Sequence, residues 1–254
     1  PLNGNRPREN YDGFGEISDV CIKRKIRNRL MDFGHPVFVQ PDDRRVDGFK
    51  SLSERAKANP AVAEADRAKD KEAFARAACE AWIDVRSFGQ VFAFKGDELS
   101  VGVRGPVSVH PAFSLTPVEI ESIQITKSVN SEPGKDKKAS DTMGTKHRVN
   151  HAAYVFYGSI NCQLAEKTGF SEEDAEEIKK ALRSLFENDA SSARPEGSMA
   201  VREVYWWKHN CKSGQYASAR VHESIEVKDQ KEAPYYMIIR HDLEGLEPEV
   251  CKCE

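Results

Sequence analysis

The chain has 254 residues and a net charge of −3, with 38 basic and 41 acidic residues. This balance excludes a uniformly basic nucleic-acid binder, and no apolar run approaches membrane-spanning length. We expect a single domain over residues 1–254 that carries insertions. Six cysteines without a C-x-x-C spacing favour free thiols over disulfides or a metal site, so we expect no metal, no cofactor, no membrane partner and a cytoplasmic location.

The chain opens with a Gly-, Asn- and Pro-rich loop that contains Asn5, Arg6 and Arg8. A cationic loop of this kind suits contact with a polyanion. No strand pattern is evident before the first predicted helix. We therefore expect the first strand of the sheet to be absent from the chain.

Residues 18–30 predict a helix with the densest positive charge in the chain. Ser18 can cap it, and apolar residues every four positions give it a buried stripe. Five cations lie within residues 23–29 with hardly any acid among them. Such a run is usually a solvated helix face, but the missing acids and the basic loop before it favour phosphate contact. The candidate contacts are Lys23, Arg24, Lys25 and Arg27.

Residues 32–61 are polar and rich in Gly and Pro, which predicts an irregular surface insertion. A core-facing helix is expected over residues 66–85. Residues 90–94 and 99–103 then predict two strands of a hairpin. Arg86 and Arg104 flank this hairpin beside glycines. Each is either an ordinary surface arginine or a phosphate contact, since glycine lets a backbone approach closely.

Residues 122–129 and 142–149 predict the two strands of a long hairpin with basic flanks. The segment between them, residues 131–141, is poor in apolar residues and rich in turn formers, so we expect a mobile tip. Met143 beside this tip is either a wedge between nucleic-acid bases or a side chain that packs on the neighbouring strand.

In the last third of the chain we expect strands at residues 153–160, 201–208, 220–227 and 235–240, and an acidic helix after Ser171. Ser171 and Asp174 have the spacing of a capping box. The sequence contains no P-loop, HExxH, GxSxG or dinucleotide fingerprint. His147 and His151 are four residues apart in a strand pattern, which does not suit a metal pair. Binding is therefore favoured over catalysis, and we do not expect an enzyme.

Six segments resemble, in order, the Csd-type Cas-seven family, the CRISPR RNA (crRNA) binding backbone subunit of the type I-C Cascade. They are GNRPR at residues 4–8, DVCIKRKIRN at 19–28, DVRSFG at 84–89, VRGPV at 103–107, TMGTKH at 142–147 and LAEKTGFS at 164–171. The segments span most of the chain, and several are long, so the resemblance is specific.

The resemblance implies an α+β fold of the RAMP superfamily. It has an RRM-like (ferredoxin-like) antiparallel sheet as palm with helices on one face, a finger insertion at residues 32–65 and a thumb hairpin at 119–150. Copies of the subunit would stack as an oligomer along one crRNA, join other Cascade subunits, and present the crRNA to target DNA in antiviral defence. The implied RNA-binding residues are Asn5, Arg6, Arg8, Lys23, Arg24, Lys25, Arg27, Arg86, Ser87, Phe88, Arg104, Thr126, Met143, Lys146, His147 and Arg148.

Two alternatives remain open from the sequence. One is a RAMP-superfamily endoribonuclease that processes CRISPR precursor RNA with a histidine base; such relatives carry a glycine-rich loop near the C-terminus, which residues 244–248 lack. The other is a monomeric single-stranded RNA-binding protein of RRM type, which would not need the long hairpin.

Overall fold

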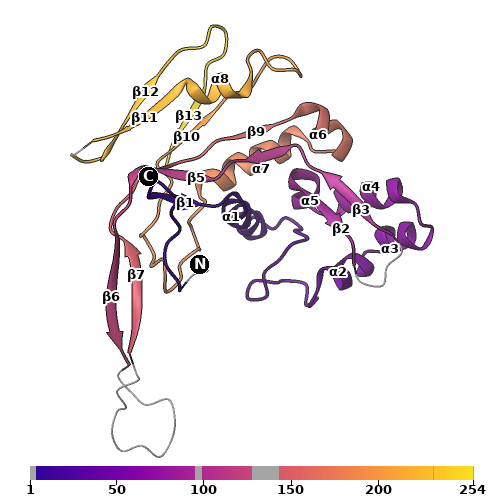
Figure 1. The fold of residues 1–254 in the computed structure, drawn as a ribbon. Coiled ribbons are helices and arrows are strands. Elements are labelled where there is room, and N and C mark those ends of the chain that lie inside the picture. The colour runs from indigo at the N-terminus through magenta and orange to yellow at the C-terminus, as the bar shows by residue number, and fades with distance from the viewer. Residues whose placement is uncertain (1–3, 95–98, 128–142, 231, 254) are drawn as a thin grey trace, which may run out of the picture. The chain divides into compact units, whose positions relative to one another are not determined.

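The computed structural model describes residues 4–94, 99–127, 143–230 and 232–253, in which helices and antiparallel strands combine as the expected α+β class (Figure 1). Contacts within the chain divide it into two compact units. Unit 1 comprises residues 1–18, 111–156 and 225–239, and unit 2 comprises residues 19–110, 157–224 and 240–254. This division does not test whether the chain is a single domain over residues 1–254, which stays a prediction.

Unit 1 contains a three-stranded antiparallel sheet in the order β1-β5-β8, together with the pair β11–β12. The strands are β1 (Phe14–Ile17), β5 (Ala112–Pro117), β8 (Tyr154–Val155), β11 (Ile225–Asp229) and β12 (Tyr236–Arg240). Because β1 precedes the first helix, the expectation of no strand there is wrong. Gly15 weakens the strand pattern, and a Cβ at this position would lie 2.3 Å from the Tyr154 hydroxyl, so a larger residue would displace the Tyr154 side chain.

The long hairpin of unit 1 is confirmed. Strands β6 (Ile120–Thr126) and β7 (Met143–Val149) pair antiparallel without a bulge, from Ile120 opposite Val149 to Thr126 opposite Met143. Figure 1 shows them as a narrow two-stranded ribbon. The predicted mobile tip at residues 131–141 lies outside the described residues.

Unit 2 is built around α1 (Asp19–Asp32), which confirms the predicted basic helix. Its apolar stripe is buried, with Ile22, Ile26 and Leu30 at most 2% exposed. The stripe therefore fixes the orientation of the helix, and α1 packs against α7 (Glu172–Arg183). The capping box that opens α7 is also confirmed, since Ser171 and Asp174 bond each other's backbone N–H groups.

Part of the stretch at residues 32–61, which was expected to be irregular, is helical, and further helices follow it. These are α2 (Leu52–Ala58), α3 (Pro60–Arg67), α4 (Lys71–Ala81) and α5 (Ile83–Phe88). Ser51, Asn59 and Asp70 each accept hydrogen bonds from the backbone at the start of a helix, and Pro60 occupies a first-turn position. These caps open short separate helices, so the core-facing helix expected at residues 66–85 is present but is divided into α4 and α5.

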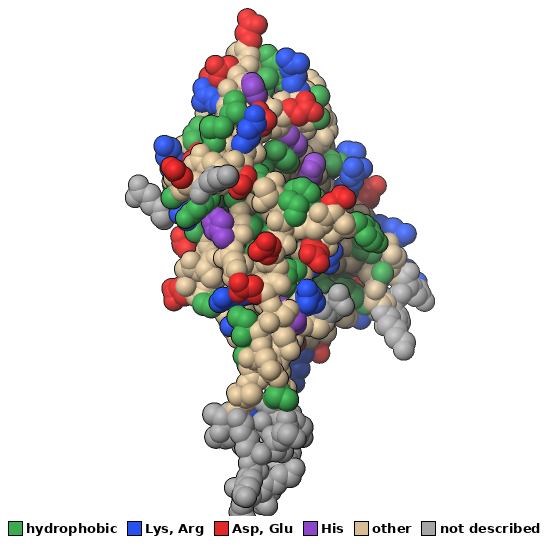
Figure 2. All heavy atoms as spheres, turned by 60° about the vertical axis from the view of Figure 1, so that its left-hand side comes forward, with side chains coloured by type: hydrophobic (Ala, Val, Ile, Leu, Met, Phe, Trp, Pro, Cys, Tyr) green, Lys and Arg blue, Asp and Glu red, His purple; other side chains and the backbone are tan. Residues whose placement is uncertain are grey.

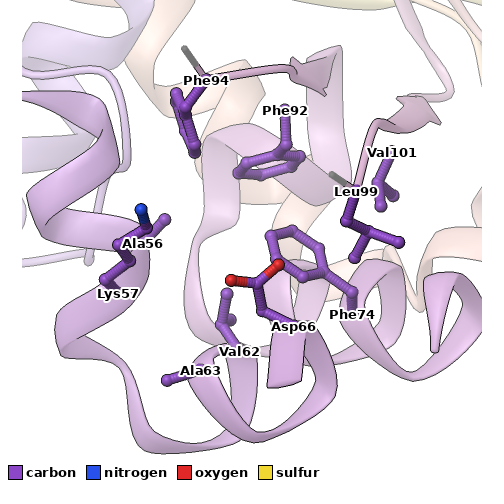
Figure 3. Close-up of a pocket in the computed structure, with 10 residues that line it drawn as sticks. All are labelled: Ala56, Lys57, Val62, Ala63, Asp66, Phe74, Phe92, Phe94, Leu99 and Val101. Atoms are coloured by element: carbon purple, nitrogen blue, oxygen red, sulfur yellow. The ribbon is translucent and has the colours of Figure 1, made fainter. Parts of the chain in front are cut away.

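The helices enclose an aromatic core that includes Phe38, Phe74, Trp82 and Phe92. The Phe92 ring centroid lies 5.1 Å from the centroids of both Phe38 and Phe74. A small apolar cleft opens over this core. Figure 3 shows Phe74 and Phe92 on its wall, with Asp66 and Lys57 among the residues that line it. The core ties α2, α3 and α4 to the hairpin formed by β2 (Gly89–Phe92) and β3 (Val101–Arg104).

The rest of unit 2 consists of short strands and helices. They are β2 (Gly89–Phe92) with β3 (Val101–Arg104), β4 (Val107–Val109) with β9 (Gly158–Ile160), α6 (Cys162–Thr168), β10 (Glu203–Trp206) with β13 (Glu249–Lys252), and α8 (Ser218–Glu223). The β2–β3 hairpin is confirmed. The strand expected at residues 153–160 is two short strands, and the one expected at 220–227 begins as α8. No helix in the described ranges is both long and apolar enough to span a bilayer.

Candidate nucleic-acid interface

The lysines of α1 have acidic partners within unit 2. Nζ of Lys23 donates to Asp19 at 3.1 Å, one helical turn away. Lys25 is only 4% exposed and pairs with Asp189, and its ammonium group also lies over the Phe186 ring. The expectation that this run lacks acidic partners is therefore wrong, because an acid distant in sequence supplies one of them. A buried, paired ammonium is not available to a phosphate, so the predicted contact of Lys25 is not supported.

Arg27 is held by the most buried carboxylate of this region. Asp84 is 0% exposed and accepts hydrogen bonds from Nε of Arg27 at 2.8 Å and from the backbone N–H groups of Phe38 and Val39 at 2.6 and 3.1 Å. The Arg27 guanidinium also stacks over the Phe88 ring, 4.9 Å from its centroid. Arg27 and Phe88 therefore have a structural function in joining α1 to α5.

Arg24 lies beside Arg27 at the edge of the same network. One of its terminal nitrogens donates to the carbonyl of Val39 at 2.7 Å. Burial, followed by the charge of Arg27, lowers the pKa of the Arg24 guanidinium. Two guanidinium groups thus lie close together, and Asp84 offsets part of their repulsion.

Arg86 is likewise paired within the protein. It lies on α5 and donates two hydrogen bonds to the carboxylate of Asp174, at 2.7 and 2.8 Å. This bidentate pair ties α5 to the first turn of α7. The neighbouring Ser87 is 0% exposed, and its hydroxyl donates to the carbonyl of Ile83 at 2.6 Å. Neither side chain is placed to meet a ligand.

Arg104 has a different setting at the end of β3. It is exposed, and its side chain has no hydrogen bond or ion pair within the described part of the chain. The glycines beside it serve the chain's own packing, since a Cβ on Gly105 would lie 2.3 Å from the carbonyl oxygen of Ser87. The glycines alone therefore do not indicate a phosphate site, and the phosphate contact of Arg104 stays a prediction that depends on its unpaired charge.

The two faces of the β6–β7 hairpin of unit 1 carry different side chains, because residues alternate along a strand. One face, here called the Arg6 face, carries the facing pairs Ser122–His147, Gln124–Thr145 and Thr126–Met143. The other, the Lys146 face, carries the pairs Glu121–Arg148, Ile123–Lys146 and Ile125–Gly144. The predicted residues Thr126, Met143 and His147 thus share one face, whereas Lys146 and Arg148 share the other.

The Arg6 face takes its name from the N-terminal loop, which reaches it. Arg6 donates a hydrogen bond to Oγ of Ser122 at 3.4 Å, and this oxygen lies 2.8 Å from Nδ1 of His147. Ser122 therefore links the two predicted residues Arg6 and His147, although the sequence analysis did not select it. Its position opposite His147 in the hairpin register could have identified it. Asn5 precedes Arg6 in the left-handed region, with φ of 61°.

The outer part of the Arg6 face is exposed and carries Met143 among polar side chains. Met143 is 58% exposed and receives a hydrogen bond from the Gln124 amide at 2.8 Å to its sulfur. Thr126, directly opposite Met143, is also exposed. Met143 is not buried against a neighbouring strand, so the packing alternative for it is not supported, while the base-wedge prediction stays open.

Two cations of unit 1 are neutralised, whereas others are not. Arg8 pairs with Glu16 at 3.1 Å and Arg148 with Glu121 at 2.9 Å. Lys146 is exposed and has no side-chain partner among the residues that the structure describes. Over the face drawn in Figure 2, Lys and Arg are interspersed with Asp and Glu. Of the predicted cations in the described segments, Arg6, Lys146 and Arg104 are accessible and lack a carboxylate partner, and half-buried Arg24 lacks one too but is bonded to the Val39 carbonyl.

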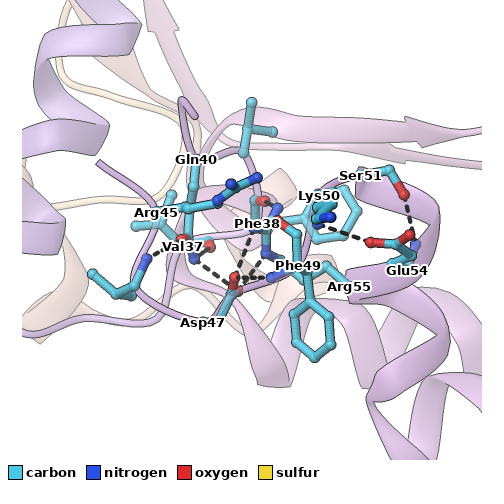
Figure 4. Close-up of polar contacts among 12 residues, drawn as sticks. Val37, Phe38, Gln40, Arg45, Asp47, Phe49, Lys50, Ser51, Glu54 and Arg55 are labelled. Atoms are coloured by element: carbon cyan, nitrogen blue, oxygen red, sulfur yellow. Dashed lines mark hydrogen bonds and ion pairs between the residues drawn. The ribbon is translucent and has the colours of Figure 1, made fainter. Parts of the chain in front are cut away.

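A second polar network fixes the loop before α2 and was not predicted. Arg55 is 4% exposed and donates to both carboxylate oxygens of Asp47, at 2.5 and 2.9 Å, and to the carbonyl of Phe38 at 2.8 Å. Figure 4 shows these bonds converging from the loop onto α2. The hydrogen bond from Arg55 holds the pKa of the Asp47 carboxyl below its usual value. The network is structural, because the donors of Arg55 are bonded to acceptors of the loop before α2.

The thiols and acids form no metal cluster in the described ranges, where no three His, Cys, Asp or Glu side chains are grouped to hold an ion. Cys79 lies in the aromatic core of unit 2, and burial raises the pKa of its thiol to about 11. A thiol with so high a pKa is a poor nucleophile at neutral pH.

Comparison with known proteins agrees with the sequence resemblance at the family level. The family model for CRISPR-associated protein Cas7 matches residues 1–241. The CRISPR-associated protein Cas7 of Haloferax volcanii is 27% identical over 249 residues, which cover 90% of this chain and 70% of the Haloferax protein. A chain of a solved CRISPR RNA-guided surveillance complex, pre-nicking, aligns with a TM-score of 0.50 at 14% identity, over 87% of this chain and 82% of that one, and so has a similar fold. The chain belongs to the Cas7 family of CRISPR-associated proteins.

Proposed function

We propose that this protein is a backbone subunit of a CRISPR Cascade complex that binds crRNA. In this function it binds the phosphate backbone of crRNA without sequence preference, stacks with further copies of itself along the RNA, and presents the bases to target DNA in antiviral defence. The match to the Cas7 family model over most of the chain carries the proposal. A type I-C system, an RRM-like palm, other Cascade subunits as partners and a cytoplasmic location belong to the same proposal.

The hairpin of unit 1 supports RNA binding physically. Arg6 and Lys146 present charge that no carboxylate neutralises among the residues described, so a phosphate could pair with them without breaking an existing ion pair. Contacts to phosphate carry no sequence information, which suits a subunit that must accept many guide sequences. Met143 and Thr126 on the Arg6 face add an exposed surface for bases.

The proposed subunit has no catalytic function of its own. Holding a guide RNA requires positioned donors and exposed cations, which the hairpin supplies, whereas RNA cleavage requires a general base within reach of a ribose hydroxyl. No observation on the described residues favours the endoribonuclease alternative. Cleaved repeat RNA after incubation with the protein would favour it.

The proposal is tested by measuring the affinity of the full chain for two unrelated single-stranded RNAs over a series of salt concentrations. Lys146→Gln and Arg104→Gln should each weaken binding to both RNAs equally and reduce the slope of log affinity against log salt by about 0.7. Arg148→Gln is the matched control, because Glu121 already neutralises Arg148, and it should change the slope less. Absent or sequence-dependent binding by the wild type would contradict the proposal.

A further inference from the structure

The hydroxyl of Ser122 connects a cation and a titratable side chain on the Arg6 face. Arg6 donates to Oγ of Ser122 at 3.4 Å, and the same oxygen is 2.8 Å from Nδ1 of His147. Ser122 is exposed, while Arg6 and His147 are half-buried, so a ligand can reach all three. Neither Arg6 nor His147 pairs with a carboxylate within the described residues. The three side chains therefore form an accessible cluster of donors with uncompensated positive charge.

The charge of His147 decides how many donors this cluster presents. In one neutral tautomer Nδ1 of His147 carries no proton, and the Ser122 hydroxyl donates its hydrogen bond to this nitrogen. In the other, Nδ1–H donates to Ser122, but a lone pair on Nε2 faces outward and repels an anion. When the imidazole is protonated, Nδ1–H donates to Ser122 Oγ while Nε2–H is free. Ser122 then accepts from both Arg6 and His147, and its own O–H is released to donate outward.

We propose that Arg6, Ser122 and His147 form a phosphate-binding site that takes a phosphodiester group of the RNA backbone and binds it more tightly when His147 is protonated. Protonation adds one positive charge and one donor, and the three donors then converge on a single anion. An imidazole changes its charge between about pH 5 and 8, so the site responds within the physiological range. This inference rests on the proposed RNA-binding function and adds to it a specific site and a pH response.

The charged neighbours of the site leave it available. Glu121 on β6 accepts hydrogen bonds from Arg148 and from Asn150, and lies on the Lys146 face of the hairpin. In the N-terminal segment of unit 1, Glu16 pairs with Arg8. Glu121 and Glu16 are therefore engaged by other donors, Glu9 and Asp12 are exposed, and no carboxylate of the described residues bonds Ser122 or His147. Lys146 and Arg148, next to His147 on β7, lie on the opposite face and add only long-range positive potential.

The test is the affinity of the full chain for a fluorescein-labelled single-stranded RNA, measured by fluorescence anisotropy at about pH 6 and about pH 8 in the same salt. The wild type should bind about tenfold more tightly at the lower pH, as expected for one added charged hydrogen bond. His147→Gln should abolish this ratio while keeping binding at the higher pH. Ser122→Ala should reduce the ratio, and Arg6→Gln should weaken binding at both pH values.

Arg148→Gln is the control on the other face of the hairpin, and it should keep the tenfold ratio. A second measurement on the wild type avoids dependence on variants: the NMR titration midpoint of the His147 ring should rise when RNA is added, and inorganic phosphate alone should raise it less. If the ratio persists in His147→Gln, or the midpoint does not move with RNA, the inference is overturned and RNA binding stands. If the wild type binds RNA at neither pH, both proposals fail.

Discussion

Asp84 is a single buried carboxylate that pairs with Arg27, a cation of the basic run in α1. It accepts hydrogen bonds from Arg27 and from two backbone N–H groups, and it is fully buried. The paired arginine is therefore part of the fold, and its removal would leave a buried charge without a partner. A loss of RNA binding after mutation of Arg27 would consequently not identify an RNA contact.

We predict that Asp84→Ala lowers the free energy of unfolding by about 3–5 kcal/mol, because it strands the Arg27 guanidinium and two buried donors. Urea denaturation followed by circular dichroism measures this. Asp42→Ala is the matched control, since its contact with Arg45 is 3.5 Å long and the Asp42 side chain is 91% exposed, and it should change stability little. Equal effects of the two substitutions would show that Asp84 does not anchor α1.

The candidate cations divide in a way that sequence alone could not predict. The run in α1 contains hardly any acids, which made it look available, but Asp189 and Asp84 meet Lys25 and Arg27 only after folding. By contrast, Lys146 and Arg104 were predicted from basic flanks and strand ends, and the structure leaves both exposed. Ion pairs between residues distant in the chain produce no periodic pattern in the sequence, whereas the ends of strands can be predicted from such a pattern.

Among the structural elements, the loop before α2 depends on one ion pair. Hydrogen bonding from Arg55 lowers the pKa of Asp47 below its ordinary value of 3.8. A carboxyl with a lowered pKa in the folded protein stabilises the fold above its unfolded pKa, and this contribution is lost as pH falls through the folded pKa. The loop before α2 should therefore be among the acid-sensitive parts of the fold.

We predict that part of the wild type's stability loss below about pH 4 disappears in Asp47→Asn, which cannot titrate at this position. At neutral pH the variant should be less stable than the wild type, and the difference should shrink toward acid. The free energy of unfolding over a pH series measures this. A difference that stays constant from neutral to acid pH would contradict the assignment to Asp47.

The N-terminus of α7 offers a second test among the elements. Ser171 caps the helix, and Asp174 both completes the capping box and receives the bidentate Arg86. Ser171→Ala should cost about 1 kcal/mol of unfolding free energy. Ser171→Asn, which keeps a side-chain acceptor, should restore most of it. If both variants lose the same amount, the cap does not contribute as described.

For the molecule as a whole, local signals predicted the elements with strong periodicity or caps, and tertiary context decided the others. The basic helix, the long hairpin and the capped acidic helix were all readable from residue spacing. Strand β13 was missed because its sequence is a polar tail, and it forms only by pairing with β10, where Cys251 becomes buried. Strand β1 was missed because it is short and contains Gly15.

The proposed function is tested most directly by the RNA that the protein carries when it is purified from a host that expresses a CRISPR array. We would measure the particle mass by light scattering, then extract and sequence the RNA. We predict protected repeat–spacer RNA in a particle that contains several copies of the chain. An RNA-free monomer, or bound RNA unrelated to the array, would contradict the proposal that this chain is a crRNA-binding Cascade backbone subunit.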